Sequence, residues 1–363
     1  MHRKPIFVSR RVFVGLAAVL AILPLSYVPL SGQASRPAGQ TANTQSTRKW
    51  TPPRTPWGDP DLQGSFTNLS EDGTPLERPD QFAGRKLEDI KGEELAAIKR
   101  QVQQRTVTTF QGPLHAPEHW WQDDLNLVKG SQAWLIVDPP DGKVPPLTPE
   151  AKERAAARAQ ARRPANALPA SWEDLTLYDR CITRGLPGSM MPAIYGNSYQ
   201  IVQAPGIVTI RYEMVHEARV IPIASATHPG SPHVSQAIRS YMGDARGHWE
   251  SSAQPDRGVV RAQEADTLVV ETTNFRDETA YRGANAATLK LIERFTRIAP
   301  DKVKWSVTVD DPSTWTRPWT FAMPLTMDES QPVLEYGCHE GNYGLRNILS
   351  AARAAEQKAA EGR

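Results

Sequence analysis

Two His-Glu pairs are the residues best suited to acid–base chemistry in this sequence, at His216-Glu217 and His339-Glu340. A histidine can act as a general base near neutral pH, and a nearby carboxylate can orient it or act as an acid. A zinc-protease helix needs a second histidine four residues after the first, and neither pair has one. The pairs therefore predict a metal-free His–carboxylate site of the hydrolase or lyase type.

Polar residues on or beside predicted strands form a second candidate set, suited to holding a polar ligand inside a barrel. The predicted ligand-binding residues are Arg211, Glu213, Glu271, Asn274, Glu293, Arg317, Trp319 and Tyr343. The two aromatic residues would serve as walls, as in carbohydrate-binding sites, although such side chains also pack in cores. The alternative is that the charged residues face solvent or form structural ion pairs, such as Glu293 with Arg317 across strands.

Other signatures of chemistry are incomplete. His115 and His119 have the spacing of one helical face, but Pro113 and Pro117 oppose a helix there. The sequence contains neither a Gly-x-Ser-x-Gly elbow nor a glycine-rich phosphate loop followed by Lys and Ser or Thr. We therefore predict no metal site and no cofactor.

The framework expected to position these side chains is a set of short strands in the second half of the chain. A strict period-two alternation, typical of a strand with one buried face, is carried by Val303, Trp305, Val307 and Val309. Further strands are predicted over 199–203, 207–214, 218–223, 266–273, 288–297, 316–323 and 333–338. No long helical pattern separates them, and 224–265 is loop-rich. This arrangement favours an antiparallel β-barrel or sandwich in residues 199–340.

Helical patterns flank the predicted strands. Apolar residues recur at helical spacing within 87–105, and Thr148-Pro149-Glu150 is a typical helix start before an Ala/Arg run. One strand is expected near Ala133–Val137. The predicted fold is mainly β with peripheral helices (α+β): an irregular and helical N-terminal region, 57–198, packs on the β domain, 199–340, and a C-terminal helix occupies 341–363.

The first 34 residues have the charge and hydropathy order of an export signal. Four basic residues, two of them Arg10-Arg11, accompany an apolar stretch from Val12 to about Leu30, and a small-x-small site ends at Ala34. Ser9-Arg10-Arg11-Val12-Phe13 also matches a twin-arginine motif. We predict a signal peptide over 1–34, a disordered spacer over 35–56, and a mature protein in the periplasm or outside the cell. An uncleaved membrane anchor is the alternative.

Charge and hydropathy limit the classes of partner. The chain has 42 basic and 40 acidic residues, and four of the basic residues lie in the signal, which leaves 38 against 40 and a net charge of −2. This balance provides no electrostatic reason to expect a nucleic acid partner. Membrane contact is expected only through the signal segment. The expected partner is a small-molecule ligand, and the oligomeric state stays open.

The sequence has two cysteines, Cys181 and Cys338. In an oxidising compartment such a pair predicts a disulfide, which here would close a loop of more than 150 residues. A reactive thiol at Cys338 beside His339 is one alternative, and two buried free thiols are another.

Eight segments together resemble a family of exported bacterial proteins of unknown function. They are TPWGDPDLQG (55–64), LIVDPPDGKVPPLTPEA (135–151), RCITRGLPG (180–188), YQIVQAPGIV (199–208), VETTNF (270–275), ERFTR (293–297), TVDDPSTWTRPWT (308–320) and YGCHEGNYGL (336–345). The resemblance covers nearly all of the mature chain and implies a single architecture. The family pattern GHWEGDTLVVETTNF is interrupted here by 251–265, which we interpret as a lengthened hairpin loop.

Three functions are compatible with these observations. We favour an exported envelope protein that binds a small hydrophobic or carbohydrate-like ligand in a β-barrel, because this function needs no catalytic motif. A periplasmic hydrolase or lyase with a His/carboxylate site is the second, and a structural envelope protein is the third. An enzyme should bring a histidine and a carboxylate together in a pocket, a binder should have a cavity with few ionisable groups, and a structural protein should expose an apolar patch.

Overall fold

The computed structural model of this protein describes residues 50–110, 130–161, 167–193, 196–224, 230–253, 265–330 and 333–362. The predicted signal peptide, most of the predicted spacer, the His115–His119 segment and most of the 251–265 insertion lie outside these ranges. The side chains of residues 105–110 and of His216 are also outside the description.

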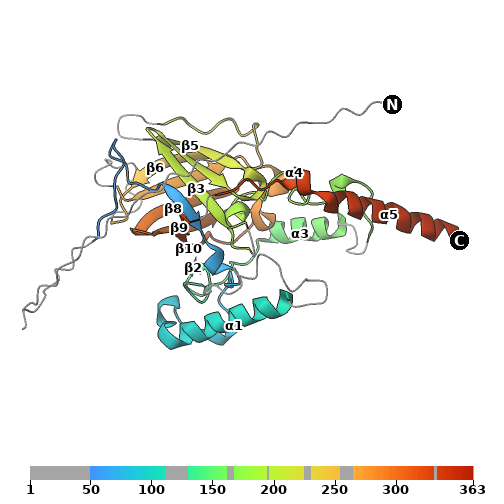
Figure 1. Cartoon of the computed structure of the whole chain (residues 1–363), viewed down its shortest axis with the longest axis horizontal. Coiled ribbons are helices and arrows are strands. Elements are labelled where there is room, and N and C mark those ends of the chain that lie inside the picture. The colour runs from blue at the N-terminus through green and yellow to red at the C-terminus, as the bar shows by residue number, and fades with distance from the viewer. Residues whose placement is uncertain are drawn as a thin grey trace, which may run out of the picture. The chain divides into compact units, whose positions relative to one another are not determined.

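One sheet of ten strands dominates the described chain (Figure 1). The strands are β1 (Gly64–Thr67), β2 (Ile136–Asp138), β3 (Ser198–Ala204), β4 (Ile207–Tyr212), β5 (Ala218–Ala224), β6 (Asp244–Glu250), β7 (Thr267–Thr273), β8 (Lys290–Ala299), β9 (Lys302–Asp310) and β10 (Trp319–Met327). The order β1-β3-β4-β5-β6-β7-β8-β9-β10 closes through pairing of β1 with β10, and β2 is an extra strand on β10. The result is a closed nine-stranded barrel.

The predicted fold class, mainly β with some helices and a barrel, is confirmed. The prediction of a purely antiparallel sheet needs one correction, because β5 and β6 pair in parallel. The barrel also uses β1, which comes from the region expected to pack outside it. Residues 333–337 form no strand, and 338–341 are helical, so the strand predicted over 333–338 is wrong.

Strand β6 lies in the stretch 224–265 that was expected to be loop-rich. Its inward positions are Ala245, Gly247 and Trp249, of which two are small. A side chain added at Gly247 would place its Cβ 2.5 Å from Cδ1 of Ile223 on β5. A small residue there lets the two strands pack closely without a shift of the Ile223 side chain, and small residues leave a weak hydrophobic alternation in the sequence.

The described helices are α1 (Gly92–Phe110), α3 (Pro149–Ala161), α4 (Cys338–Gly341) and α5 (Tyr343–Glu361). Three of them, α1, α3 and α5, overlap the helical patterns of the sequence, whereas α4 begins where a strand was predicted. The expected cap of α3 is present, since the backbone N–H of Ala151 donates to Oγ1 of Thr148 at 3.1 Å. None of the helices in the described ranges combines the length and apolar character needed to cross a bilayer.

Short 3₁₀ turns make up much of the connecting structure. They are η1 (Leu69–Glu71), η2 (Asp80–Phe82), η3 (Leu87–Asp89), η4 (Trp172–Asp174), η5 (Gly188–Met190), η6 (Met214–His216), η8 (Asp277–Thr279) and η9 (Tyr281–Gly283). The described part of the region 57–198 thus contributes β1, β2, α1, α3 and several such turns.

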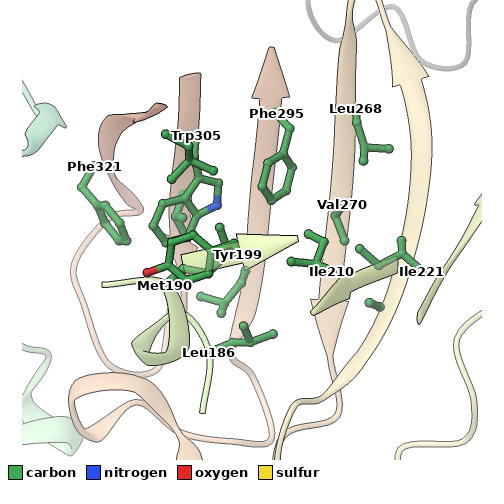
Figure 2. Close-up of a cluster of buried hydrophobic side chains, with 14 of the residues drawn as sticks. Leu186, Met190, Tyr199, Ile210, Ile221, Leu268, Val270, Phe295, Trp305 and Phe321 are labelled. Carbon is green, nitrogen blue, oxygen red and sulfur yellow. The ribbon is translucent and has the colours of Figure 1, made fainter. Parts of the chain in front are cut away.

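Side chains fill the barrel interior. The alternating residues of β9 that were predicted to be buried are all fully buried: Val303, Trp305, Val307 and Val309. Figure 2 shows Trp305, Phe295 and Tyr199 converging from different strands. Leu186 and Met190, from the segment that precedes β3, belong to the same core. We call residues 183–191 the plug, because this segment sends two apolar side chains into the barrel core.

One ion pair lies inside this apolar core. Nη2 of Arg219 on β5 donates to Oε1 of Glu293 on β8 at 3.2 Å, and Nε1 of Trp305 donates to the same oxygen at 3.1 Å. Both charged side chains are almost completely buried. Strands β6 and β7 separate β5 from β8 in the sheet, so the ion pair spans the barrel interior.

Removal of one member of this pair should destabilise the barrel strongly. Glu293→Leu leaves the Arg219 guanidinium buried without its carboxylate, and we expect the free energy of unfolding to fall by about 3–5 kcal/mol. The double variant Arg219→Met with Glu293→Leu removes both charges and should recover much of that loss. Denaturant unfolding of wild type, Glu293→Leu, Arg219→Met and the double variant tests this, and a double variant that loses as much as the sum of the two single variants would contradict it.

Candidate functional site

A pocket of about 660 Å³ lies beside the plug. Two stretches of chain line it: residues 173–188, which lead into and form part of the plug, and residues 278–282, in the connection from β7 to β8. Leu186 belongs both to the pocket lining and to the barrel core. The pocket therefore opens on the outer side of the segment that fills one part of the barrel.

Gly185 allows the two stretches to approach each other. Its φ of +66° is in the left-handed region, and a Cβ atom at this position would lie 3.3 Å from Cβ of Thr279. Gly185 is part of the RCITRGLPG segment that the sequence analysis singled out. A glycine here satisfies both the backbone turn and the close contact between the two walls.

An aromatic stack supports one wall of the pocket. Tyr281 stacks on Trp319, with ring centroids 6.2 Å apart, and Trp319 is itself fully buried against Trp315 and Phe321. Burial raises the pKa of the Tyr281 phenol above its ordinary value, which neighbouring Arg282 partly opposes. Trp319, predicted as a ligand wall, thus lies behind the wall and holds Tyr281 in place.

Glu217 lies directly behind another wall residue. Oγ1 of Thr183 donates to Oε2 of Glu217 at 2.7 Å and accepts from the backbone N–H of Gly185 at 2.9 Å. Burial raises the pKa of Glu217, while hydrogen bonds from Thr183 and from the backbone N–H of Arg184 act in the opposite direction. The structure thus connects this predicted catalytic residue to the pocket through Thr183.

Two arginines of the lining are held against aromatic rings. The guanidinium carbon of Arg180 lies 4.5 Å from the ring centroid of Trp172, and that of Arg184 lies 5.1 Å from the centroid of Tyr178. Contacts of this kind attract the cation to the ring face and restrict its position. Arg180, Arg184 and Tyr178 were not among the predicted site residues, although the quoted RCITRGLPG segment contains both arginines.

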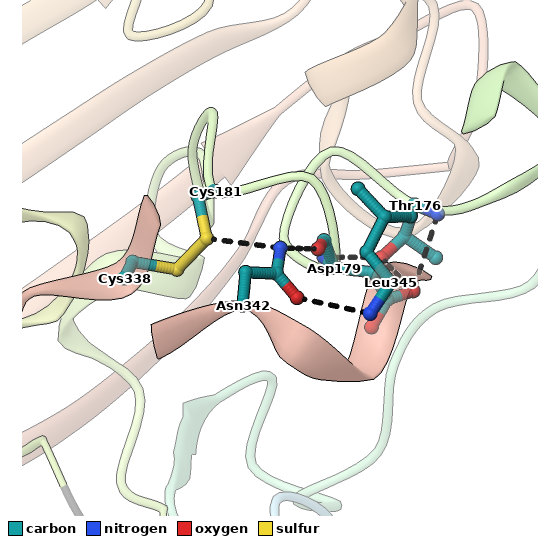
Figure 3. The surroundings of a disulfide bond; sticks show 6 residues. All are labelled: Thr176, Asp179, Cys181, Cys338, Asn342 and Leu345. Atoms are coloured by element: carbon teal, nitrogen blue, oxygen red, sulfur yellow. Dashed lines mark hydrogen bonds between the residues drawn. A yellow bond between two sulfur atoms is a disulfide. The ribbon is translucent and has the colours of Figure 1, made fainter. Parts of the chain in front are cut away.

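The predicted disulfide between Cys181 and Cys338 is present (Figure 3). It joins the pocket-lining stretch to α4. Asn342 adds a second link, because its Nδ2 donates to the backbone oxygen of Asp179 at 2.8 Å while its Oδ1 accepts from the N–H of Leu345 at 3.2 Å. One wall of the pocket is therefore anchored to the start of α5.

Two of the remaining residues predicted as catalytic, His339 and Glu340, do not line this pocket. His339 and Glu340 are exposed on α4, next to the disulfide, and Tyr343 at the start of α5 is 69% exposed. The side chain of His216 lies outside the described part of the structure.

The predicted pair between Glu293 and Arg317 does not form, because Glu293 points into the barrel and binds Arg219. Arg317 precedes β10 and instead contacts Asp138 of β2, with Nη2 3.2 Å from both carboxylate oxygens. Arg211 is half-buried on β4 at a position that alternates with the inward Ile210 and Tyr212. Glu213 accepts a hydrogen bond from the backbone N–H of Ser198 at 3.1 Å.

Glu271 and Asn274 belong to a network around His233. Nδ1 of His233 lies 2.8 Å from Oδ2 of Asp244, and its Nε2 lies 3.5 Å from Oε1 of Glu271. The side-chain amide of Asn274 donates to the backbone oxygens of residues 234 and 235, at 3.0 and 3.2 Å. The network holds the loop that carries His233 against β6 and β7.

No family model, no curated protein and no solved structure matches this chain.

Loss of the disulfide should destabilise the protein and loosen the pocket. Cys181→Ala with Cys338→Ala opens a link across 157 residues, and we expect the free energy of unfolding to fall by about 2–5 kcal/mol. Denaturant unfolding measures the loss, and proteolysis near residues 173–184 should accelerate. Wild type whose disulfide has been reduced with a thiol is the matched comparison. If neither the free energy of unfolding nor the rate of cleavage changes, the disulfide does not stabilise the protein or hold the pocket wall.

Neutralisation of Glu217 should stabilise the protein most at neutral pH. Because burial raises the pKa of Glu217 in the folded state, the folded protein holds a proton that the unfolded chain has already lost, and stability falls as pH rises through that window. Glu217→Gln keeps an acceptor for Thr183 but has no proton to lose. Its gain in melting temperature should grow from about pH 4 towards pH 7, with exposed Glu335→Gln as the control; a gain independent of pH would oppose this.

Proposed function

We propose that this chain is an exported envelope protein, carried by the twin-arginine route, that binds a small carbohydrate-like ligand in the pocket beside the plug. The observation that carries the proposal is the pocket itself, with a volume of about 660 Å³. Pockets that hold small molecules are usually between about 300 and 1,000 Å³. The export component rests on the sequence of residues 1–34.

Five charged residues line the pocket, which differs from the cavity with few ionisable groups expected of a binder, and the lining favours a polar ligand over a hydrophobic one. Three threonines, two tyrosines and several charged residues contribute to it, among them Thr183, Tyr178 and Tyr281. A sugar presents hydroxyl groups that bond to such side chains, and C–H faces that pack on aromatic rings. This composition supports a carbohydrate-like ligand among the two classes that the sequence allowed.

The barrel contributes rigidity in this proposal. Its described interior is occupied by packed side chains, so the ligand would lie outside the core, on loops that a rigid scaffold positions. The Tyr281–Trp319 stack and the Cys181–Cys338 disulfide fix the two walls independently. Such a site needs little ordering when the ligand binds, which favours affinity.

The hydrolase or lyase alternative has weaker support. Glu217 adjoins the pocket, but the described residues that line the pocket include no histidine. The His339-Glu340 pair is exposed and does not line this pocket, and general acid–base catalysis requires the base within hydrogen-bond reach of the bound substrate.

A bulky residue at Gly188 should block the pocket. Gly188 lines the pocket, its φ is accessible to other residues, and an added Cβ would meet no atom within 4 Å. We expect Gly188→Trp to fold and to bind sugars at least tenfold more weakly than wild type. Gly341→Trp is the matched control, because Gly341 also has open space around it but does not line the pocket.

The measurement is isothermal titration calorimetry against a panel of neutral and acidic mono- and disaccharides. Wild type and Gly341→Trp should bind the same members of the panel. Equal affinity of Gly188→Trp for those members would show that binding occurs elsewhere, and the absence of any binding by wild type would refute the carbohydrate proposal.

A further inference from the structure

The charges that line the pocket are not balanced. Three arginines, Arg180, Arg184 and Arg282, contribute to the lining, against two glutamates, Glu173 and Glu278. One of these carboxylates is already engaged, because Nη2 of Arg276 lies 3.1 Å from Oε1 of Glu278, and this hydrogen bond lowers the pKa of Glu278. The pocket therefore presents an excess of positive charge to whatever enters it.

The three lining arginines have no carboxylate partner among the described residues. Within the described residues, none of the three forms an ion pair with a carboxylate within 4.0 Å, whereas Arg219 and Arg317 both do. Arg180 and Arg184 instead lie over the faces of Trp172 and Tyr178. A guanidinium stacked on a ring is positioned by it and keeps its in-plane N–H donors for other acceptors.

These cations are partly removed from water. Arg180 and Arg184 are half-buried, and a charge that leaves water without a counter-charge is unfavourable. Burial raises the pKa of the Tyr199 phenol inside the barrel, and the positive charge of Arg184 acts on it in the opposite direction. The positive charge of Arg184 therefore acts on a group inside the barrel as well as on the pocket. An anion bound in the pocket would neutralise this charge.

We propose that the ligand of this pocket carries a carboxylate or phosphate group, bound by Arg184 and Arg180 with Arg282 at the exposed edge. A planar guanidinium donates two parallel N–H bonds to either group, so the shared chemistry is a planar or tetrahedral oxyanion. The arginines favour the oxyanion, and the hydroxyl and aromatic side chains of the lining favour a sugar. The two preferences together indicate an acidic sugar, such as a uronic acid or a sugar phosphate. The inference rests on the proposed function, since it assigns the charge of the ligand bound there.

The test compares matched neutral and acidic probes by isothermal titration calorimetry at low salt. The probes are D-glucose, D-glucuronate and D-glucose 6-phosphate, with inorganic phosphate as the bare anion. Wild type should bind at least one acidic sugar about tenfold or more tightly than glucose, and added salt should weaken only the acidic sugars. The two acidic arms distinguish a carboxylate from a phosphate.

Variants assign the effect to the arginines. Arg184→Gln should weaken the acidic sugar about 10- to 100-fold and glucose much less, because the charge-assisted hydrogen bond to the anionic group is lost. Arg184→Lys should retain part of the affinity. Arg282→Gln, at an exposed position, should fold normally and lose less, and exposed Arg346→Gln on α5 is the control. Thermal melting of each variant verifies its fold.

The outcomes separate this inference from the proposed function. If glucose binds as tightly as the acidic sugars, or if neither arginine variant changes their relative affinity, the anion assignment is overturned and the sugar-binding proposal stands. If phosphate binds in an Arg184-dependent way and no sugar binds, the anion assignment is supported and the carbohydrate proposal fails. If no probe binds to wild type, both are overturned.

Discussion

Pairing of β1 with β10 closes the sheet into a barrel that has no free edge strand. The interior of such a barrel must be filled by side chains. In this chain the strands supply most of the filling, and the plug supplies Leu186 and Met190. Because Leu186 and Met190 pack into the barrel core, the backbone of the plug is fixed in position, and so are the plug residues that face away from the core. The pocket lies on that other side, so the filling of the barrel also places the candidate site.

The polar groups of the interior have a related role. The Arg219–Glu293 pair lies among aromatic and aliphatic side chains and shares its carboxylate with Trp305. Buried ion pairs contribute little net stability, but an arrangement that separates the two charges is strongly disfavoured. The pair therefore favours one relative position of β5 and β8 over neighbouring registers.

The pocket differs from the interior in how its charges are matched. Inside the barrel an arginine meets a glutamate, whereas at the pocket Arg180 and Arg184 meet aromatic faces. The disulfide and Asn342 anchor the stretch that carries these arginines to α4 and α5. Rigid walls, unbalanced positive charge and hydroxyl groups are together the properties expected of a preorganised site for a polar anion.

The sequence by itself determined the elements whose signals are local. Period-two alternation identified β9, a Thr-Pro start identified α3, and an even pair of cysteines identified the disulfide. It failed for β6, whose small inward residues leave little hydrophobic alternation. It placed Glu217 and Trp319 among the site residues, and both prove to lie behind the pocket walls, yet it missed Arg184 and Tyr281. Only the tertiary structure decided the pocket, because its two walls lie nearly a hundred residues apart in irregular segments, and no local pattern encodes which distant segments meet.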